Sequence, residues 1–289
     1  MASPRAGTFT APKIRKTTKR MIADWAGSGN DMKAAYHDSR FRRDDRPLVY
    51  AHRGSSAAMP ENTCAAFELA ARQRADGIEC DVRLCGSGEL VVCHDERLDR
   101  LAGLPFHVAE LPLGELRTIP ILSQRFPGTS ATVPTLEEAV ECAGPGLVWN
   151  LEIKVDRHED AEGLARAVAG AIPRLPLAGR VLVSSFHPLA LLTVRKVAPG
   201  IPTAWLWERG GPAQRAWAAF WGRLCATHAL HPDAAMVRAR DVEAWHRRGL
   251  LVNAWTVDDP AEIARLRGWG VDGVITNRPA EALQVLERA

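Results

Sequence analysis

The chain has 289 residues, with 46% hydrophobic and 25% charged side chains and a formal net charge of +3. These values are ordinary for a globular protein and allow one large α/β domain or two modest ones. No apolar run approaches the ~20 residues needed to cross a bilayer, and the first 30 residues lack the apolar core of a secretory signal. We therefore expect a cytoplasmic protein rather than a membrane-spanning one.

The charge is concentrated at the N-terminus. Residues 1–46 hold 11 lysines and arginines against five aspartates, whereas the remaining residues carry more acidic than basic side chains. Such a segment can contact an anionic surface, but it lacks the strong apolar stripe of an amphipathic anchor. We expect residues 1–46 to be a solvated basic extension with at most weak contact to anionic membranes, and we expect no nucleic-acid partner.

From residue 47 to residue 289, short β-rich runs alternate with helical patterns. The predicted strands are residues 48–52, 77–83, 147–153, 181–185, 202–206, 226–230, 250–255 and 274–276. The predicted helices are residues 62–75, 135–142, 158–171, 188–197, 213–221, 237–248, 260–268 and 280–289. Asn62 is the expected N-cap of the first helix, since it follows Pro60 and precedes the periodic residues.

Eight such strand–helix units predict a (β/α)₈ TIM barrel, because strands that alternate with crossover helices run parallel. An open doubly wound sheet is the rival architecture, but the Gly-rich fingerprint expected after its first strand is missing. A short extended run at residues 90–94 follows the second strand. Residues 96–133 are rich in Gly and Pro and predict an irregular insertion after that strand rather than a separate domain.

The six cysteines form no CxxC pair and no zinc-ligand spacing. Four of them sit in apolar stretches or beside strand residues. We therefore expect free thiols, rather than disulfides or a zinc site.

Acidic side chains gather where the strands of a barrel would open into an active site. Glu79 and Asp81 are two residues apart and so share one strand face, and Glu152 occupies the next main strand. Three carboxylates this close repel one another unless a cation lies between them, and oxygen ligands alone favour Mg²⁺ or Ca²⁺ over zinc. The alternative is a set of carboxylates paired with Arg or Lys, such as Glu152 with Lys154.

Two histidines and two cations lie at the same predicted strand ends. His52 and His94 suit a general acid and base for cleaving a P–O bond, although each alone also fits a structural hydrogen-bonding role. Arg53 can neutralise a phosphodiester through two parallel hydrogen bonds. Lys154 is one of only six lysines in a chain with 31 arginines, which favours a need for a compact point charge there.

The sequence resembles the glycerophosphodiester phosphodiesterase family over roughly residues 47–285. The matching motifs are His52-Arg53-Gly54, Pro60-Glu61-Asn62-Thr63, Glu79-Cys80-Asp81-Val82, His94-Asp95, Leu151-Glu152-Ile153-Lys154, Ser184-Ser185-Phe186, Asn253-Ala254-Trp255-Thr256 and Thr276-Asn277-Arg278-Pro279. Their joint order and spacing make the resemblance specific. Two positions depart from the family pattern: His187 replaces a usual Asn or Asp, and Asn277 occupies the place of a common Asp.

The resemblance implies metal-dependent hydrolysis of glycerophosphodiesters to glycerol 3-phosphate and an alcohol. It further implies one divalent cation, Mg²⁺ or Ca²⁺, held by Glu79, Asp81 and Glu152, with His52 and His94 as the acid–base pair. The other implied roles are phosphate binding by Arg53 and Lys154, support of the His52 loop by Asn62, and an apolar wall of Phe186 and Trp255 against the glycerol.

Two alternative functions remain open at the level of sequence. A phospholipase on the same barrel, of lysophospholipase D or sphingomyelinase D type, would need an apolar track, for which the candidates are Trp205, Trp207, Phe220 and Trp221. The same aromatic residues also fit packing between helices and barrel. A non-catalytic binding barrel, recruited to membranes by residues 1–46, is the second alternative, and the intact set of candidate catalytic residues argues against it.

Overall fold

The computed structural model describes residues 38–121, 126, 131–156, 161–177, 179–208, 220–222, 224–225 and 228–288. Residues 1–37 of the predicted extension and residues 213–219 of a predicted helix lie outside these described residues.

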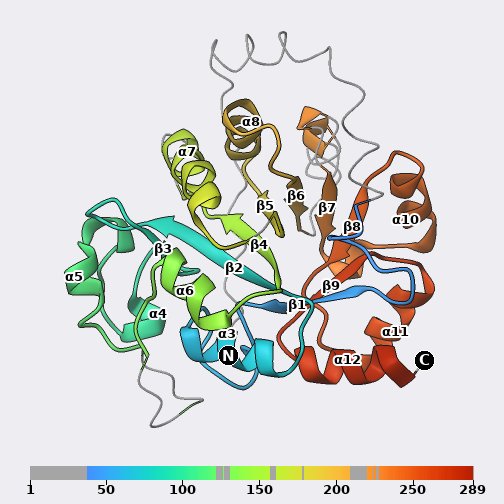
Figure 1. Ribbon diagram of the computed structural model, residues 1–289, viewed down its shortest axis with the longest axis horizontal. Coiled ribbons are helices and arrows are strands. Elements are labelled where there is room, and N and C mark those ends of the chain that lie inside the picture. The colour runs from blue at the N-terminus through green and yellow to red at the C-terminus, as the bar shows by residue number, and fades with distance from the viewer. Residues whose placement is uncertain are drawn as a thin grey trace, which may run out of the picture.

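Eight parallel strands close into a barrel (Figure 1). They are β1 (Leu48–His52), β2 (Gly77–Leu84), β4 (Val148–Ile153), β5 (Val181–Ser185), β6 (Thr203–Trp207), β7 (Ala229–Pro232), β8 (Leu251–Ala254) and β9 (Gly273–Thr276). Strand β1 pairs with both β2 and β9 and thereby closes the sheet. The predicted TIM barrel is confirmed, and a closed sheet rules out the doubly wound alternative.

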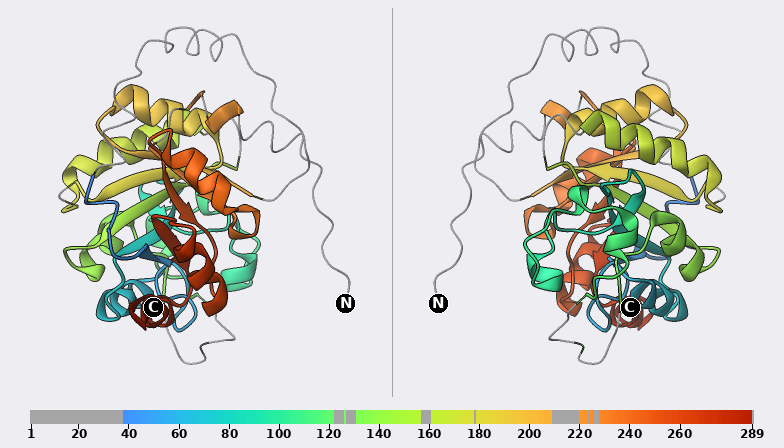
Figure 2. Two further views of the ribbon diagram at one scale, coloured as in Figure 1. Left: turned by 90° about the vertical axis from the view of Figure 1, so that its right-hand side faces the viewer. Right: turned by 90° about the vertical axis from the view of Figure 1, so that its left-hand side faces the viewer.

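Helices surround the barrel on the outside, as Figures 1 and 2 show from three directions. They are α3 (Cys64–Arg72), α6 (Leu136–Ala143), α7 (Ala161–Ala171), α8 (Pro188–Val197), α10 (Ala239–His246), α11 (Pro260–Gly268) and α12 (Pro279–Arg288), with 3₁₀ turns η3 (Ile172–Arg174) and η4 (Ala234–Met236). Because strand side chains alternate, one face of each strand packs on helices and the other fills the barrel. Trp149 of β4, for example, contacts Phe67 of α3 at 5.7 Å between ring centroids.

The irregular segment after the second strand begins with a hairpin. Strand β3 (Leu90–Val92) runs antiparallel to β2, and three short elements follow: α4 (Asp99–Ala102), η1 (Val108–Glu110) and α5 (Leu113–Leu116). This insertion projects from the side of the barrel in Figure 1 and has a small apolar core of its own that includes Leu98, Leu116 and Val133. The insertion is therefore a packed elaboration of the barrel.

Two sequence expectations about elements are wrong. The N-cap of α3 is Thr63, whose side chain accepts a hydrogen bond from the Ala66 amide, because Asn62 has a φ of +56° and turns its side chain toward Asp81. Strand β7 (Ala229–Pro232) runs two residues beyond the predicted end at residue 230, and residues 226 and 227 of the predicted strand lie outside the described residues. Its inner residue His231 is polar yet buried, so hydrophobicity does not mark this strand's position.

Residues 38–46 pack against the end of the barrel where the strands begin. Phe41 is buried, Arg46 forms an ion pair with Asp76 at 2.5 Å, and Arg40 donates a hydrogen bond to the carbonyl of Gly179. This part of the predicted extension thus belongs to the folded body.

No helix in the described part of the chain is long and apolar enough to pass through a bilayer. All six cysteines are free thiols, as predicted.

Candidate active site

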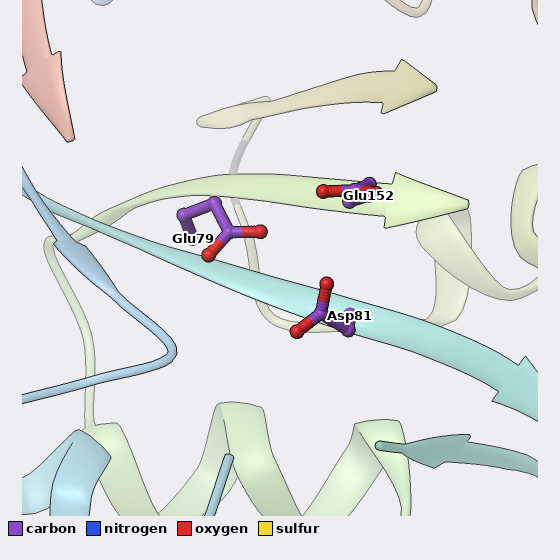
Figure 3. A group of neighbouring side chains, drawn as sticks. All are labelled: Glu79, Asp81 and Glu152. Carbon is purple, nitrogen blue, oxygen red and sulfur yellow. The ribbon is translucent and has the colours of Figure 1, made fainter. Parts of the chain in front are cut away.

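Three carboxylates converge inside the barrel mouth. The register places Glu79 of β2 beside His52 of β1, and Asp81 of β2 beside Glu152 of β4. All three acidic side chains are buried, and one carboxylate oxygen from each lies within 4.8 Å of the others. Figure 3 shows the three carboxylates turned toward a common space between β2 and β4.

Two cations partly balance this acidic cluster. Lys154 Nζ lies 3.0 Å from Asp81 Oδ1 and 2.5 Å from Glu152 Oε1, and Arg53 Nε lies 3.1 Å from Asp81 Oδ2. Burial by itself would lower the pKa of Lys154, but Asp81 and Glu152 outweigh it and raise that pKa to about 12. The Glu152–Lys154 pair, which the sequence offered as the alternative to a metal site, therefore exists within a larger charged network.

The cations do not neutralise all three carboxylates. Burial, together with the charges of Asp81 and Glu152, raises the pKa of Glu79 well above its ordinary value. Burial also raises the pKa of Glu152, whereas Lys154 and Arg53 hold the pKa of Asp81 below its ordinary value despite burial. Within the described residues, Oε1 of Glu79 is buried without a hydrogen-bond partner.

A divalent cation fits this arrangement. The cation would coordinate the unpartnered oxygen of Glu79 and relieve the repulsion that raises the carboxylate pKa values. The donor set consists of oxygens alone, which selects a hard cation. The buried acidic triad can therefore bind a metal ion.

His52 faces the acidic cluster from the end of β1. Its Nδ1 lies 2.8 Å from Oδ1 of Asn277, and its Nε2 lies 3.8 Å from Oε2 of Glu79. Burial and, to a smaller extent, the positive charge of Arg53 lower the pKa of His52 to about 4. His52 is therefore neutral near pH 7.

His94 approaches the same cavity from beyond β3. Its Nδ1 lies 2.6 Å from Oδ1 of Asp95, whose other oxygen accepts a hydrogen bond from Arg100. The buried Arg83 donates to the carbonyls of Cys93 and His94 and so fixes the backbone here. Sequence reasoning missed Arg83, although its position two residues after Asp81 puts it on the same strand face.

The loop after β1 is tied to the acidic cluster. The backbone amide of Arg53 donates to the Glu79 carboxylate at 3.1 Å, and its guanidinium pairs with Glu61 at 3.0 Å. Asn62 donates from its side chain to Asp81 at 2.8 Å and from its backbone amide to the carbonyl of Arg53 at 2.9 Å. Asn62 thus connects the His52–Arg53 loop to Asp81.

These side chains enclose a cavity of about 180 Å³. Phe186 and Trp255 form one wall, with their rings edge to face at 5.5 Å between centroids. The lining residues are His52, Arg53, Glu79, His94, Asn150, Glu152, Lys154, Phe186, Leu206, Glu208, Trp255 and Ile275. A second cleft of about 540 Å³, between the insertion and α7, shares Lys154 with this cavity.

The four aromatic residues considered as an apolar track do not line the cavity. Trp205 and Trp221 are buried in the core between barrel and helices, and Trp207 packs edge to face on Trp245 of α10. Phe220 alone of the four is exposed. Leu206, between the two strand tryptophans, is the β6 residue that faces the cavity.

Comparison with known proteins gives concordant results. The model of the glycerophosphoryl diester phosphodiesterase family matches residues 52–281. A glycerophosphodiester phosphodiesterase of Caldanaerobacter subterraneus is 33% identical over 247 residues, which cover 84% of this chain and 99% of that protein. One from Bacillus subtilis is 30% identical over 250 residues, covering 81% and 85%.

A similar solved structure is that of an Oleispira antarctica phosphodiesterase in complex with the product sn-glycerol-3-phosphate. It superposes with a TM-score of 0.76 at 28% sequence identity and covers 84% of this chain and 97% of that one.

Proposed function

The chain belongs to the glycerophosphoryl diester phosphodiesterase family, and we propose that it hydrolyses glycerophosphodiesters to glycerol 3-phosphate and an alcohol with the help of one divalent cation. The observation that carries this proposal is the convergence of Glu79, Asp81 and Glu152 within 4.8 Å of one another. Two of these carboxylates, those of Glu79 and Glu152, line one small cavity together with His52 and His94.

The proposed cation is Mg²⁺ or Ca²⁺, held by the three carboxylates. When bound, it supplies positive charge that stabilises the negative charge developing on the phosphoryl oxygens. Arg53 and Lys154, which line the same cavity, would bind the remaining phosphate oxygens, the former through its planar guanidinium and the latter as a point charge.

The size of the cavity supports the placement of the small glycerol part of the substrate in it, on one side of the phosphate. Its volume of about 180 Å³ lies below the roughly 300–1,000 Å³ of sites that enclose drug-sized ligands. The Phe186–Trp255 wall would contact the carbon atoms of the glycerol. The alcohol arm would extend toward the larger cleft, because that cleft shares Lys154 with the cavity.

The two histidines would transfer the protons. Neutral His52 has its Nδ1 bonded to Asn277, so Nε2 is the atom that accepts a proton from the attacking oxygen. His94 bonds the Asp95 carboxylate through Nδ1, which orients the ring, and we assign it the donation of a proton to the departing alcohol.

The alternative functions find less support. A lysophospholipid-type substrate needs an apolar track, and three of its four candidate residues pack within the core instead. A non-catalytic barrel gives no reason to keep three mutually repelling carboxylates buried together. We further propose a cytoplasmic location, which the six free thiols support.

The test is release of glycerol 3-phosphate from glycerophosphodiesters with several head groups, with added Mg²⁺ or Ca²⁺ and with a chelator. Chelation and Glu152→Gln are each expected to lower kcat/KM by on the order of 10³-fold or more, because each removes charge stabilisation worth several kcal/mol. Glu141→Gln is the matched control, since Glu141 is exposed on α6 and does not line the cavity. Hydrolysis that survives both chelation and Glu152→Gln would contradict the proposal.

A further inference from the structure

Asp258 and Asn277 form a hydrogen-bonded pair behind His52. Asp258 follows β8, and Asn277 directly follows β9. One oxygen of the Asp258 carboxylate accepts from the Asn277 backbone amide at 2.8 Å and from Thr276 Oγ1 at 2.9 Å. The other oxygen accepts from the Asn277 side-chain Nδ2 at 2.6 Å. The carboxylate therefore holds both the backbone and the side chain of Asn277.

This pairing fixes which way the Asn277 amide points. An ionised carboxylate only accepts hydrogen bonds, so the side chain of Asn277 must turn its NH₂ group toward Asp258. Its Oδ1 must then face the opposite side, where it accepts from Ser56 Oγ at 2.8 Å and lies 2.8 Å from Nδ1 of His52. Reversing the amide would point its oxygen at Oδ2 of Asp258, so that the hydrogen bond from Nδ2 would be lost and two acceptor oxygens would face each other.

The orientation of Asn277 sets the tautomer of His52. A carbonyl oxygen can only accept, so His52 Nδ1 must carry the hydrogen. In a neutral imidazole, the lone pair is then on Nε2, the atom 3.8 Å from the Glu79 carboxylate and at the edge of the cavity. We propose that Asp258 and Asn277 are positioning residues that hold His52 as the Nδ1–H tautomer, with the lone pair of Nε2 directed into the active site.

The residue type at position 277 explains why two residues are needed. An aspartate at this position would accept from His52 by itself, with no second group to orient it. An asparagine has a donor and an acceptor end, and only the Asp258 carboxylate makes the acceptor end face His52. The amide provides this acceptor without placing another negative charge beside the acidic cluster.

The primary test is the ring tautomer of His52, measured by ¹⁵N NMR on the full-length protein labelled at histidine, with Mg²⁺ present. The wild-type spectrum is expected to show a protonated Nδ1 and an unprotonated Nε2, with assignment by loss of the signals in His52→Gln. A protonated Nε2 in the wild type would overturn the proposal whether or not any variant folds. The tautomer can be measured whether or not the protein hydrolyses glycerophosphodiesters. Only the kinetic measurements rest on the proposed function.

The kinetic arm uses a carboxylate–amide exchange. Asp258→Asn presents NH₂ to Asn277, turns the Asn277 amide over and shifts His52 to the Nε2–H tautomer, so kcat should fall on the order of 10²-fold or more with little change in KM. The double variant Asp258→Asn with Asn277→Asp restores every donor–acceptor match. It should recover the Nδ1–H signature and bring kcat back to within about tenfold of wild type.

Asp259→Asn is the matched control, since Asp259 is exposed and caps α11 through its side-chain oxygen, and Asn caps equally well. It should change neither the tautomer nor kcat. Full kcat in Asp258→Asn with an unchanged His52 spectrum would refute the positioning role, as would a double variant that folds but recovers neither readout.

Discussion

His231 illustrates what burial does to a single ionisable side chain. It lies inside the barrel with only 1% of its surface exposed, 2.9 Å from the side-chain nitrogen of Asn253 and 3.5 Å from that of Asn150. Burial lowers its pKa from the ordinary 6.5 to about 3. The native state therefore keeps His231 neutral at pH values where the unfolded chain protonates it. Its contribution to stability is complete above pH 6.5 and is lost progressively as the pH falls toward 3.

Replacing His231 should thus remove part of the acid sensitivity of the fold. Between about pH 7 and about pH 5, the wild type should lose about 2 kcal/mol more unfolding free energy than His231→Gln, because the unfolded state binds one extra proton over that interval. Urea unfolding at the two pH values measures the difference. Thr118→Ala, at an exposed position without an ionisable group, is the control and should show the pH dependence of the wild type. Equal pH dependence in wild type and His231→Gln would contradict the expectation.

The residues of the site differ in how far the sequence reveals them. Glu79, Asp81 and Glu152 were predictable because strand alternation and parallel pairing put them on one face. Asp258 was not, because its effect on His52 passes through Asn277, and the bonds join the end of β1 to the segments after β8 and β9, up to 225 residues away. No local pattern encodes such a contact.

At the scale of elements, α6 has a complete capping box. Thr135 Oγ1 accepts from the Glu138 amide, and the Glu138 carboxylate accepts from the Thr135 amide. Helix α6 packs on α3 at the barrel exterior, away from the cavity lining. The box therefore contributes to stability and not to the site.

Thr135→Ala should lower the unfolding free energy by about 1 kcal/mol, the usual cost of losing a side-chain N-cap. The kcat/KM should stay unchanged, because none of the α6 residues lines the active-site cavity. Thr118→Ala, at an exposed position after α5, should stay within about 0.5 kcal/mol of wild type. Thermal or urea unfolding distinguishes the two variants, and a loss of activity in Thr135→Ala would show that α6 matters to the site.

Element prediction was most accurate where apolar periodicity and packing agree. Strands β1 and β5 and helices α8 and α11 have the predicted bounds. It was less accurate where polar residues are buried, as in β7, and where short elements depend on their neighbours. The insertion was expected to be irregular because its Gly and Pro residues break periodicity, yet its short helices are stabilised by the small apolar core around Leu98, Leu116 and Val133.

At the scale of the whole molecule, the barrel has charged networks at both ends. The mouth holds the acidic site, and the opposite end holds residues 38–46. There Arg46 and Asp76 have side chains only 10% and 12% exposed, and Asp76 also accepts from the Val49 amide of β1 at 2.8 Å. We predicted a boundary at residue 47 because the charge composition changes there. Charge composition cannot reveal that Arg46 pairs with Asp76, a residue 30 positions away.

Two truncations distinguish the packed part of the basic segment from the rest. Removing residues 1–46 should cost on the order of 3–5 kcal/mol more unfolding free energy than removing residues 1–37. The larger deletion leaves the nearly buried Asp76 without Arg46 and exposes the surface covered by Phe41. Arg46→Gln in the full chain isolates the ion pair and should lie between the two. Equal stability of both truncations would show that residues 38–46 add nothing to the fold.

The same proteins test the proposed weak contact with anionic membranes. Residues 1–37 carry seven of the eleven basic side chains and only two of the five aspartates, so most of the attraction, at about 1 kcal/mol per basic residue near the surface, should come from them. Pelleting with anionic vesicles should therefore fall when residues 1–37 are removed and should fall for the full chain as salt is added. Vesicles without anionic lipid are the control. Equal pelleting of the full chain and of the chain that lacks residues 1–37 would contradict a membrane contact through residues 1–37.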